Sequence, residues 1–308
     1  MASLDQALDQ ARALSWQHHG AKLGIYLPGM FTAYGRKGRY PAVSITGQEC
    51  RQGCDHCRGQ LLRTMRPACG GEALYALGKR LAAQGQLGML ISGGSDPQGR
   101  LPWDSVLGGI ERLARETDLV LTAHVGRIGA ATARALKAAG VRQALIDVVG
   151  SEGTARRVLH LPDGLAAQSE TLAACAEAGL EVVPHIIMGL DHGHIIGEYD
   201  ALELVAALNP RRVVFVVLMP LKDTPLARAE PPAVEEVASF MAQARLRLPA
   251  ARHHLGCARP RGRYRARLDG LAVRAGINAL AIPSDGALEQ ARSLGVKVSF
   301  QDTCCSLA

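Results

Sequence analysis

The chain has 308 residues, of which 48% are hydrophobic, and it carries 35 basic and 28 acidic side chains for a net charge of +7 at pH 7. This composition excludes a disordered protein and is typical of a globular one that buries a sizeable core. No apolar run approaches the roughly 18–20 residues that a membrane-spanning helix needs. The acidic N-terminal stretch is unlike a signal peptide. We therefore expect a cytoplasmic protein with no membrane partner.

The aromatic content, charge and cysteine content indicate which kinds of partner and which cellular compartment to expect. Only 4% of the residues are aromatic, too few for a surface on which single-stranded nucleic acid could stack, so we expect no nucleic-acid partner. The positive charge suggests an acidic protein partner, an anionic substrate or a phosphate-bearing cofactor; the alternative is a mildly basic surface with no functional role. Eight cysteines without a repeating disulfide framework fit a reducing compartment and metal binding.

A helix is predicted at 4–16, and beyond it apolar runs alternate with Ala- and Leu-rich helical stretches. A glycine-punctuated basic loop at 34–40 is either a solvated hairpin or a lip over the active site that contacts an acidic partner. The predicted strands are 42–45, 87–92, 118–124, 143–149, 180–188, 212–219, 252–256, 277–282 and 296–300. The predicted helices between them are 72–84, 103–116, 130–139, 169–178, 201–208, 233–246 and 264–275.

This alternation predicts an α/β fold with a parallel sheet that is buried on both faces. About eight strand–helix repeats begin at residue 42, which favours a (β/α)8 TIM-type barrel. The alternative is a partial (β/α)6 barrel with a C-terminal extension. We expect an N-terminal helix and loop extension at 1–40, the barrel at 41–290 and a tail at 291–308.

Three cysteines lie close together directly after the first predicted strand. Cys50, Cys54 and Cys57 form a C-x3-C-x2-C triplet, and a tight loop can aim three thiolates at one point. Thiolates are the ligands that iron–sulfur clusters and zinc prefer. Three ligands leave one iron of a four-iron cube open to a small molecule. Zinc motifs usually have two C-x2-C pairs, and no second pair is present, so a cluster is favoured over zinc.

The triplet resembles the signature of the radical S-adenosylmethionine (radical SAM) superfamily, in which an aromatic residue usually precedes the third cysteine. His56 stands at that position here. The resemblance implies that Cys50, Cys54 and Cys57 are both the catalytic and the metal-binding residues of a [4Fe-4S] cluster. Its open iron would bind S-adenosyl-L-methionine (SAM), which an electron from the cluster cleaves to methionine and a 5′-deoxyadenosyl radical.

A second motif follows the second predicted strand, at the strand end where TIM-type barrels carry their chemistry. The sequence SGGSD resembles the GGE-type motif that holds the amino group of SAM. The resemblance implies SAM contacts by the backbone of Gly93 and Gly94 and by Ser95 and Asp96, although the acid comes one residue late.

Further candidate site residues lie within or at the ends of the third, fourth and fifth predicted strands. His124 closes the third strand and is a cofactor-binding candidate. Asp147 lies within the fourth strand, where a buried charge needs a partner, so it is either a core polar residue or a site residue. The sequence PHIIMGLDHGHIIGE resembles the region that packs on the SAM nucleoside, which implies contacts by Met188, Gly189 and Ile195.

Three of the remaining cysteines predict a second site. Cys257 follows a predicted strand, and Cys304 and Cys305 form a vicinal pair in a polar C-terminal segment that has no reason to pack in a core. Together these thiolates would hold an auxiliary iron–sulfur cluster; the alternative is surface thiols prone to oxidation. The fourth ligand stays open among Arg259, Ser306 and Cys69. Cys175, in a predicted helix, is expected to be a small buried hydrophobe.

Two further segments are LMPLKDTPL at residues 218–226 and LGCARPRGRYR at residues 255–265. Together with the motifs above, they resemble the biotin synthase-like branch of the radical SAM superfamily. Within that branch, the resemblance is strongest to a component of the two-component lipoyl synthases. This implies a sulfurtransferase that inserts sulfur into an octanoyl chain on an acidic lipoyl carrier protein. A second lipoyl synthase component and an electron donor such as ferredoxin or flavodoxin would be further partners. Single-chain lipoyl synthases carry a cysteine triplet near the N-terminus, whereas no cysteine precedes Cys50 here.

Two alternatives stay open. One is a biotin synthase-like or other radical SAM enzyme that acts on a small molecule. The other is a non-catalytic iron–sulfur assembly or electron-transfer component, which could not cleave SAM.

Overall fold

A computed structural model describes residues 3–307. The chain divides into two compact units. Unit 1 comprises residues 3–27, 148–151 and 184–307, and unit 2 comprises residues 28–147 and 152–183. Each strand below is assigned to the unit that holds most of it. The predicted boundaries at residues 40 and 290 stay predictions.

Unit 2 contains a parallel sheet in the order β8-β7-β6-β4-β5 and a short antiparallel hairpin of β2 and β3. Strands β4, β6 and β7 are buried along nearly their whole length, which is why they are continuous apolar runs in the sequence. Its elements are β2 (Thr32–Ala33), β3 (Arg36–Lys37), β4 (Ala42–Ser44), η1 (Gln60–Thr64), β5 (Arg66–Pro67), α2 (Gly71–Ala83), β6 (Gly88–Ser92), η2 (Trp103–Ser105), α3 (Leu107–Glu116), β7 (Val120–His124), α4 (Ala130–Ala138), β8 (Gln143–Val148), α5 (Glu152–Val158) and α6 (Gly164–Glu177).

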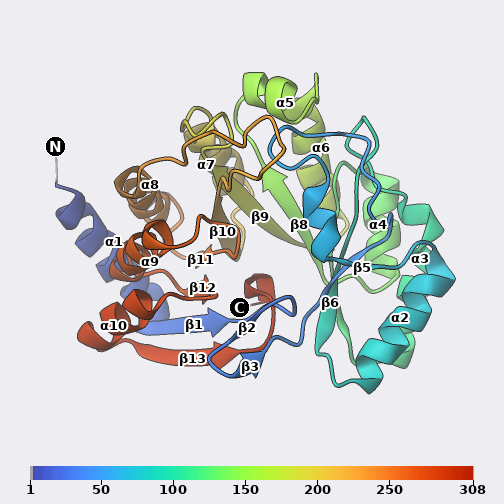
Figure 1. Ribbon diagram of the computed structural model, residues 1–308, viewed down its shortest axis with the longest axis horizontal. Helices are drawn as coiled ribbons and strands as arrows, with labels where there is room; N and C mark the ends of the chain where they lie inside the picture. The colour runs from blue at the N-terminus through green and yellow to red at the C-terminus, as the bar shows by residue number, and fades with distance from the viewer. Residues whose placement is uncertain (1–2, 308) are drawn as a thin grey trace. The chain divides into compact units, whose positions relative to one another are not determined.

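Unit 1 contains a parallel sheet in the order β13-β1-β12-β11-β10-β9. Helices α1, α8, α9 and α10 pack against one another beside this sheet (Figure 1). Its elements are α1 (Leu4–His19), β1 (Lys22–Tyr26), β9 (Glu181–Met188), α7 (Glu198–Ala207), β10 (Arg212–Val217), α8 (Val234–Arg247), β11 (Arg252–Leu255), α9 (Arg263–Arg274), β12 (Ala279–Ala281), α10 (Asp285–Ser293), β13 (Lys297–Gln301) and η3 (Cys305–Leu307).

The predicted α/β, TIM-type fold class is confirmed. In the described residues, strands and helices alternate through eight units from β4 to α10, the number that the TIM-type prediction expects. The predicted strands do not include the two-residue strands β2, β3 and β5 or the longer strand β1. Strand β1 (Lys22–Tyr26) pairs in parallel with both β12 and β13. Across residues 3–307, no helix has the length and apolar character required to cross a membrane.

The C-terminal segment is part of the unit 1 core rather than a loose polar extension. Helix η3 packs against β11 and β12. Cys305 is 4% exposed and Ser306 is fully buried. The guanidinium of Arg212, at the start of β10, donates a hydrogen bond of 2.7 Å to the carbonyl oxygen of Ser306. The expectation that this segment has no reason to pack in a core is therefore wrong, and the packing holds the two terminal cysteines in place.

Candidate active site

The loop that carries the cysteine triplet leaves β4 and is shaped by its own hydrogen bonds. The Ser44 hydroxyl donates to the carbonyl of Gly47 at 2.7 Å, and the Thr46 hydroxyl donates to the carbonyl of Glu49 at 2.9 Å. Farther along, Gly59 has a φ of +75°, a left-handed conformation that glycine adopts at little cost. These contacts fold the loop back on itself, and sequence reasoning missed Ser44 and Thr46 as residues that shape it.

The three thiols of this loop lie close enough to influence one another. Cys54 is buried, and Cys50 and Cys57 are half-buried. Burial raises the pKa of the Cys54 thiol well above its usual range, and the neighbouring Cys57 and Cys50 raise it further. Burial also raises the pKa of Cys57. A buried thiol and a half-buried one whose charged forms are disfavoured, beside a third thiol, fit a site where bound metal supplies the compensating positive charge.

His56 adds an imidazole ring to the loop, directly before the third cysteine. Burial lowers the pKa of its ring, which the nearby Asp147 and Asp55 carboxylates only partly oppose. Its Nδ1 atom is buried and has no hydrogen-bond partner in residues 3–307. A buried ring nitrogen without a partner normally costs free energy, so His56 is suited to contact a bound group. Its role toward SAM stays a prediction.

The glycine motif after β6 packs directly on the cysteine loop. The carbonyl of Ser95 accepts hydrogen bonds from the amides of Arg51 at 2.8 Å and Gln52 at 3.0 Å. The amide of Gly94 donates to the Thr46 hydroxyl at 2.7 Å. A Cβ atom on Gly94 would lie 2.6 Å from the Cα of Cys50, so only glycine permits this approach. The structure therefore brings the two motifs together within unit 2.

The Asp96 carboxylate forms hydrogen bonds within its own turn. One oxygen of its carboxylate accepts hydrogen bonds from the amides of Gln98 and Arg100, each at 2.9 Å. That oxygen orders the loop after β6, as Asp side chains commonly do in turns. Gly93 also approaches the cysteine loop, because its added Cβ would lie 3.1 Å from the Thr46 hydroxyl oxygen.

Replacing Gly94 by alanine should displace the backbone at Cys50 and lower the iron bound per chain. The reason is the Cβ position 2.6 Å from the Cα of Cys50, a distance that packed atoms do not tolerate. Gly108→Ala is the matched control, because a Cβ there would meet no atom within 4 Å. Iron analysis after anaerobic reconstitution checks the result, and equal iron content in the two variants would contradict it.

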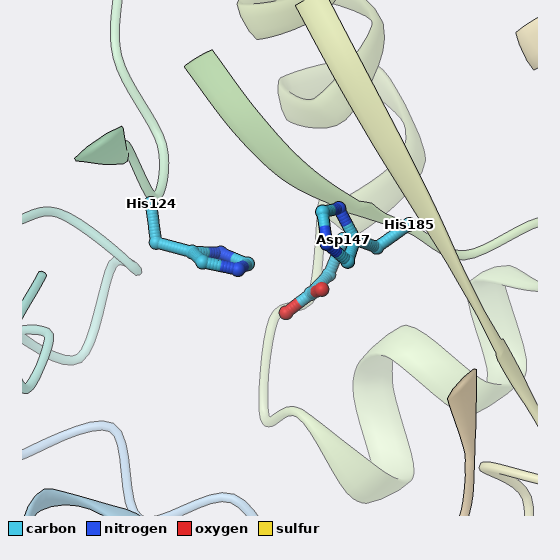
Figure 2. Close-up of side chains that lie close together, drawn as sticks. All are labelled: His124, Asp147 and His185. Carbon is cyan, nitrogen blue, oxygen red and sulfur yellow. The ribbon is translucent and has the colours of Figure 1, made fainter. Parts of the chain in front are cut away.

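Two further polar side chains of unit 2 lie at the ends of neighbouring strands. Figure 2 shows His124, the last residue of β7, and Asp147, near the end of β8. A ring nitrogen of His124 and a carboxylate oxygen of Asp147 lie within 4.8 Å of each other. Asp147 is exposed, so the interpretation of this residue as a core polar group is wrong. His185, also drawn in Figure 2, lies on β9 in unit 1.

The candidate nucleoside contacts all lie in unit 1, at and after the end of β9. Met188 is fully buried. Gly189 has a φ of +75°, and an added Cβ would collide with the ring of Pro232. Ile195 is half-exposed. The Glu198 carboxylate orders this loop by accepting hydrogen bonds from three backbone amides, those of Gly189, Ile196 and Gly197. The nucleoside contacts stay predictions.

The second cysteine set also gathers within one unit. The pKa of the Cys257 thiol is raised to about 11 by burial and by the nearby Cys304. The thiol of Cys305 donates a hydrogen bond to Cys304, which lowers the pKa of Cys304 below its usual value. The same hydrogen bond and burial raise the pKa of Cys305. Unit 1 thus places the Cys257 thiol beside a cysteine pair that is distant from it in sequence, as a thiolate-bound metal site requires.

Two of the candidates for a fourth ligand can be compared within unit 1. The Arg259 guanidinium is fully buried and forms a two-point ion pair with Asp269, at 2.7 and 3.0 Å. It also donates to the carbonyl oxygens of Gly256 and Ile282, so its donors are largely occupied. The Ser306 hydroxyl is buried beside Cys304 and has no other partner in the described chain. Cys69 is exposed and belongs to unit 2.

Comparison with family models and with curated proteins finds no match, whereas many solved structures are similar. Methylornithine synthase (PylB) is 14% identical, with a TM-score of 0.67 over 97% of this chain and 91% of that protein. HydG, a maturase of the [FeFe]-hydrogenase, is 14% identical, with a TM-score of 0.68 over 96% of this chain and 68% of HydG.

Streptococcus suis SuiB, solved bound to S-adenosylmethionine, is 12% identical, with a TM-score of 0.55 over 80% of this chain and 58% of SuiB. At these identities the likeness shows the fold alone, because one fold can carry many chemistries. The chemistry of this chain has to be argued from its own residues.

Proposed function

We propose that this protein is a radical SAM enzyme, a class that uses an iron–sulfur cluster to cleave S-adenosylmethionine. Within that class, we assign it to the sulfur-inserting enzymes, as one component of a two-component lipoyl synthase. Its substrate would be an octanoyl chain attached to a lysine of a small, acidic lipoyl carrier protein.

The observation that carries the proposal is the presence of two separate three-cysteine sets, each gathered within one unit. Cys50, Cys54 and Cys57 share one loop of unit 2, and Cys257, Cys304 and Cys305 meet in unit 1. One set suffices for SAM cleavage. A second set has no use in that step, but it would hold the cluster that donates sulfur.

The residues of the chain would divide this chemistry between them. A cluster held by Cys50, Cys54 and Cys57 would supply the electron that cleaves SAM. A cluster held by Cys257, Cys304 and Cys305 would supply sulfide to the substrate carbon radical, with its iron taking up the electron that the new carbon–sulfur bond releases. Gly93 and Gly94 allow close backbone approach beside the triplet, and the Nδ1 atom of His56 offers a polar contact. Hydrogen abstraction depends on holding the target carbon near the cleaved cofactor, so positioning the substrate is the main task of the protein.

The proposal includes three protein partners. They are the acidic lipoyl carrier protein, a second lipoyl synthase component that inserts the other sulfur, and an electron donor such as a ferredoxin or flavodoxin. The net charge of +7 supports acidic partners, because complementary charge speeds association.

The test is anaerobic reconstitution followed by reaction with octanoylated carrier protein. We expect about eight irons per chain for two four-iron clusters, SAM cleavage after reduction, and a gain of one sulfur atom in the mass of the carrier. About four irons with SAM cleavage but no sulfur transfer would favour the small-molecule alternative. Bound iron without SAM cleavage would favour the electron-transfer component.

A further inference from the structure

A short segment at the end of α5 lies against the cysteine loop within unit 2. This segment, residues 158–160, comprises the last residue of α5 and the two residues that follow it. The carbonyl of Leu159 accepts hydrogen bonds from the side-chain amide of Gln52 at 2.9 Å and from the Cys54 thiol at 3.8 Å. When Cys54 loses its proton to bind iron, this carbonyl keeps the Gln52 amide as a donor. The contact is therefore compatible with a metal-bound loop.

The segment is itself anchored in unit 2. Val158 is fully buried, and its carbonyl accepts a hydrogen bond from the amide of Asp55 at 2.9 Å. The amide of Leu161 donates to the carbonyl of Ala155 at 3.0 Å, which closes the end of α5 with backbone atoms alone. The segment can therefore hold the cysteine loop in place.

The His160 ring connects this segment to two residues of the cysteine loop. Its Nδ1 atom lies 3.2 Å from the carbonyl oxygen of Gln52, and its Nε2 atom lies 3.1 Å from a carboxylate oxygen of Asp55. The same carboxylate oxygen accepts a hydrogen bond from Arg58 at 2.7 Å. Because a carbonyl and an ionised carboxylate both act only as acceptors, the ring satisfies both contacts when both of its nitrogens carry a proton.

The backbone of His160 is in an unfavourable conformation. Its φ is +58°, in the left-handed region that residues with a Cβ atom seldom adopt. Such a conformation costs free energy and persists only where surrounding contacts impose it. Both partners that the described chain gives the ring belong to the cysteine loop. Closure of α5 does not involve the ring, so the contacts with the loop are what the strained residue provides.

We propose that His160 is a positioning residue, which holds the cysteine loop in the conformation that binds the cluster. It acts through Asp55, the residue directly after Cys54, and through the carbonyl of Gln52. The inference rests on the proposed function, because it requires a cluster on the triplet. Groups that orient metal ligands without touching the metal commonly change metal affinity 10- to 100-fold when they are removed. His160 would do this by ordering the loop before iron binds.

The test variant is His160→Gly, which removes the ring and suits a positive φ. The matched control is Asn209→Gly, because Asn209 is also exposed, has a φ of +45° and belongs to unit 1. Both changes are made in the Cys304→Ala/Cys305→Ala protein, so that the remaining iron is that of the triplet. After anaerobic reconstitution, the rate at which a ferrous chelator removes iron is measured. The measurement is repeated with Asp55→Asn added.

We expect His160→Gly to release iron about 10-fold faster than the parent protein, and the control to stay within about twofold of it. When Asp55 is already asparagine, removing the ring should add at most about threefold, because the main partner of the ring is gone. If the segment were merely a packing element, removing the ring would have the same effect in both backgrounds.

Equal iron release from His160→Gly and Asn209→Gly would overturn the proposal, and so would an equal effect of ring removal with and without Asp55. Circular dichroism checks the folding of each variant. If His160→Gly does not fold, Asp55→Asn alone must release iron faster than the parent protein, and an unchanged rate would overturn the proposal. Wild-type protein that holds iron on the triplet but cannot cleave SAM would refute the proposed function and leave this inference standing. A parent protein that binds no iron would overturn both.

Discussion

Replacing Cys54 by serine should remove about four irons per chain and reduce SAM cleavage to the background rate. Cys54 is the most buried thiol of the triplet, and burial together with Cys57 and Cys50 raises its pKa. A serine hydroxyl at that position is a poor substitute for the thiolate that iron prefers. Two remaining thiols cannot hold a four-iron cube in place. Iron analysis and the yield of 5′-deoxyadenosine after reduction measure the two effects.

The control is Cys175→Ala. Cys175 is fully buried in α6, where burial alone raises its pKa to about 12. This variant should keep its iron and its SAM cleavage, because the side chain acts only as a small hydrophobe. Circular dichroism of both variants excludes a general folding defect, and Cys57→Ser should reproduce the loss. Retention of four irons and of cleavage in the Cys54 variant would exclude the triplet as the SAM-cluster site.

The strands of this fold could be predicted because of how they are buried. A parallel strand with helices beside it must be apolar on both faces, so β4, β6, β7 and β10 are continuous hydrophobic runs that local pattern detects. The strand β1 (Lys22–Tyr26) is equally apolar, yet it precedes the repeats. Its pairing with β12 and β13 joins residues more than 250 positions apart, which no local pattern can show.

The candidate site shows the same division between local and long-range information. The spacing of Cys50, Cys54 and Cys57 is local, and it predicts a shared loop from the sequence alone. The hydrogen bonds from the amides of Arg51 and Gln52 to Ser95 involve backbone atoms of two distant loops, and side-chain identity does not encode them. Sequence reasoning could therefore identify both motifs but could not show that one packs on the other.

Asp147 and the C-terminal cysteines show where side-chain environment could not be predicted. A carboxylate within an apolar run is equally compatible with a core or a site, and only the structure shows that Asp147 is exposed. The polar segment after β13 has no hydrophobic periodicity, so nothing in it predicts burial. Its packing depends on the carbonyl of Ser306, which accepts a hydrogen bond from Arg212, and on contacts of η3 with β11 and β12.

The double variant Cys304→Ala/Cys305→Ala should lower the iron content from about eight to about four per chain and abolish sulfur insertion, while SAM cleavage continues. The structure supplies the physical reason why the variant should lose sulfur insertion but keep SAM cleavage. Both cysteines belong to unit 1 and the triplet belongs to unit 2. The carbonyl of Ser306 that receives the hydrogen bond from Arg212 is a backbone atom and is unchanged in the variant. The fold of the segment should therefore survive the loss of the two thiols.

The companion variant Cys257→Ala should lose the same four irons, because the nearby Cys304 raises the pKa of Cys257 and Cys257 in turn raises the pKa of Cys305, which places the three thiols close together. Cys175→Ala again serves as the neutral control. Continued formation of 5′-deoxyadenosine in both ligand variants would locate the defect in sulfur transfer rather than in the SAM site. About four irons in the wild type and in every variant would contradict the auxiliary cluster. The paired thiols of Cys304 and Cys305 would then need another explanation, and a one-cluster radical reaction on a small molecule would replace lipoyl synthesis.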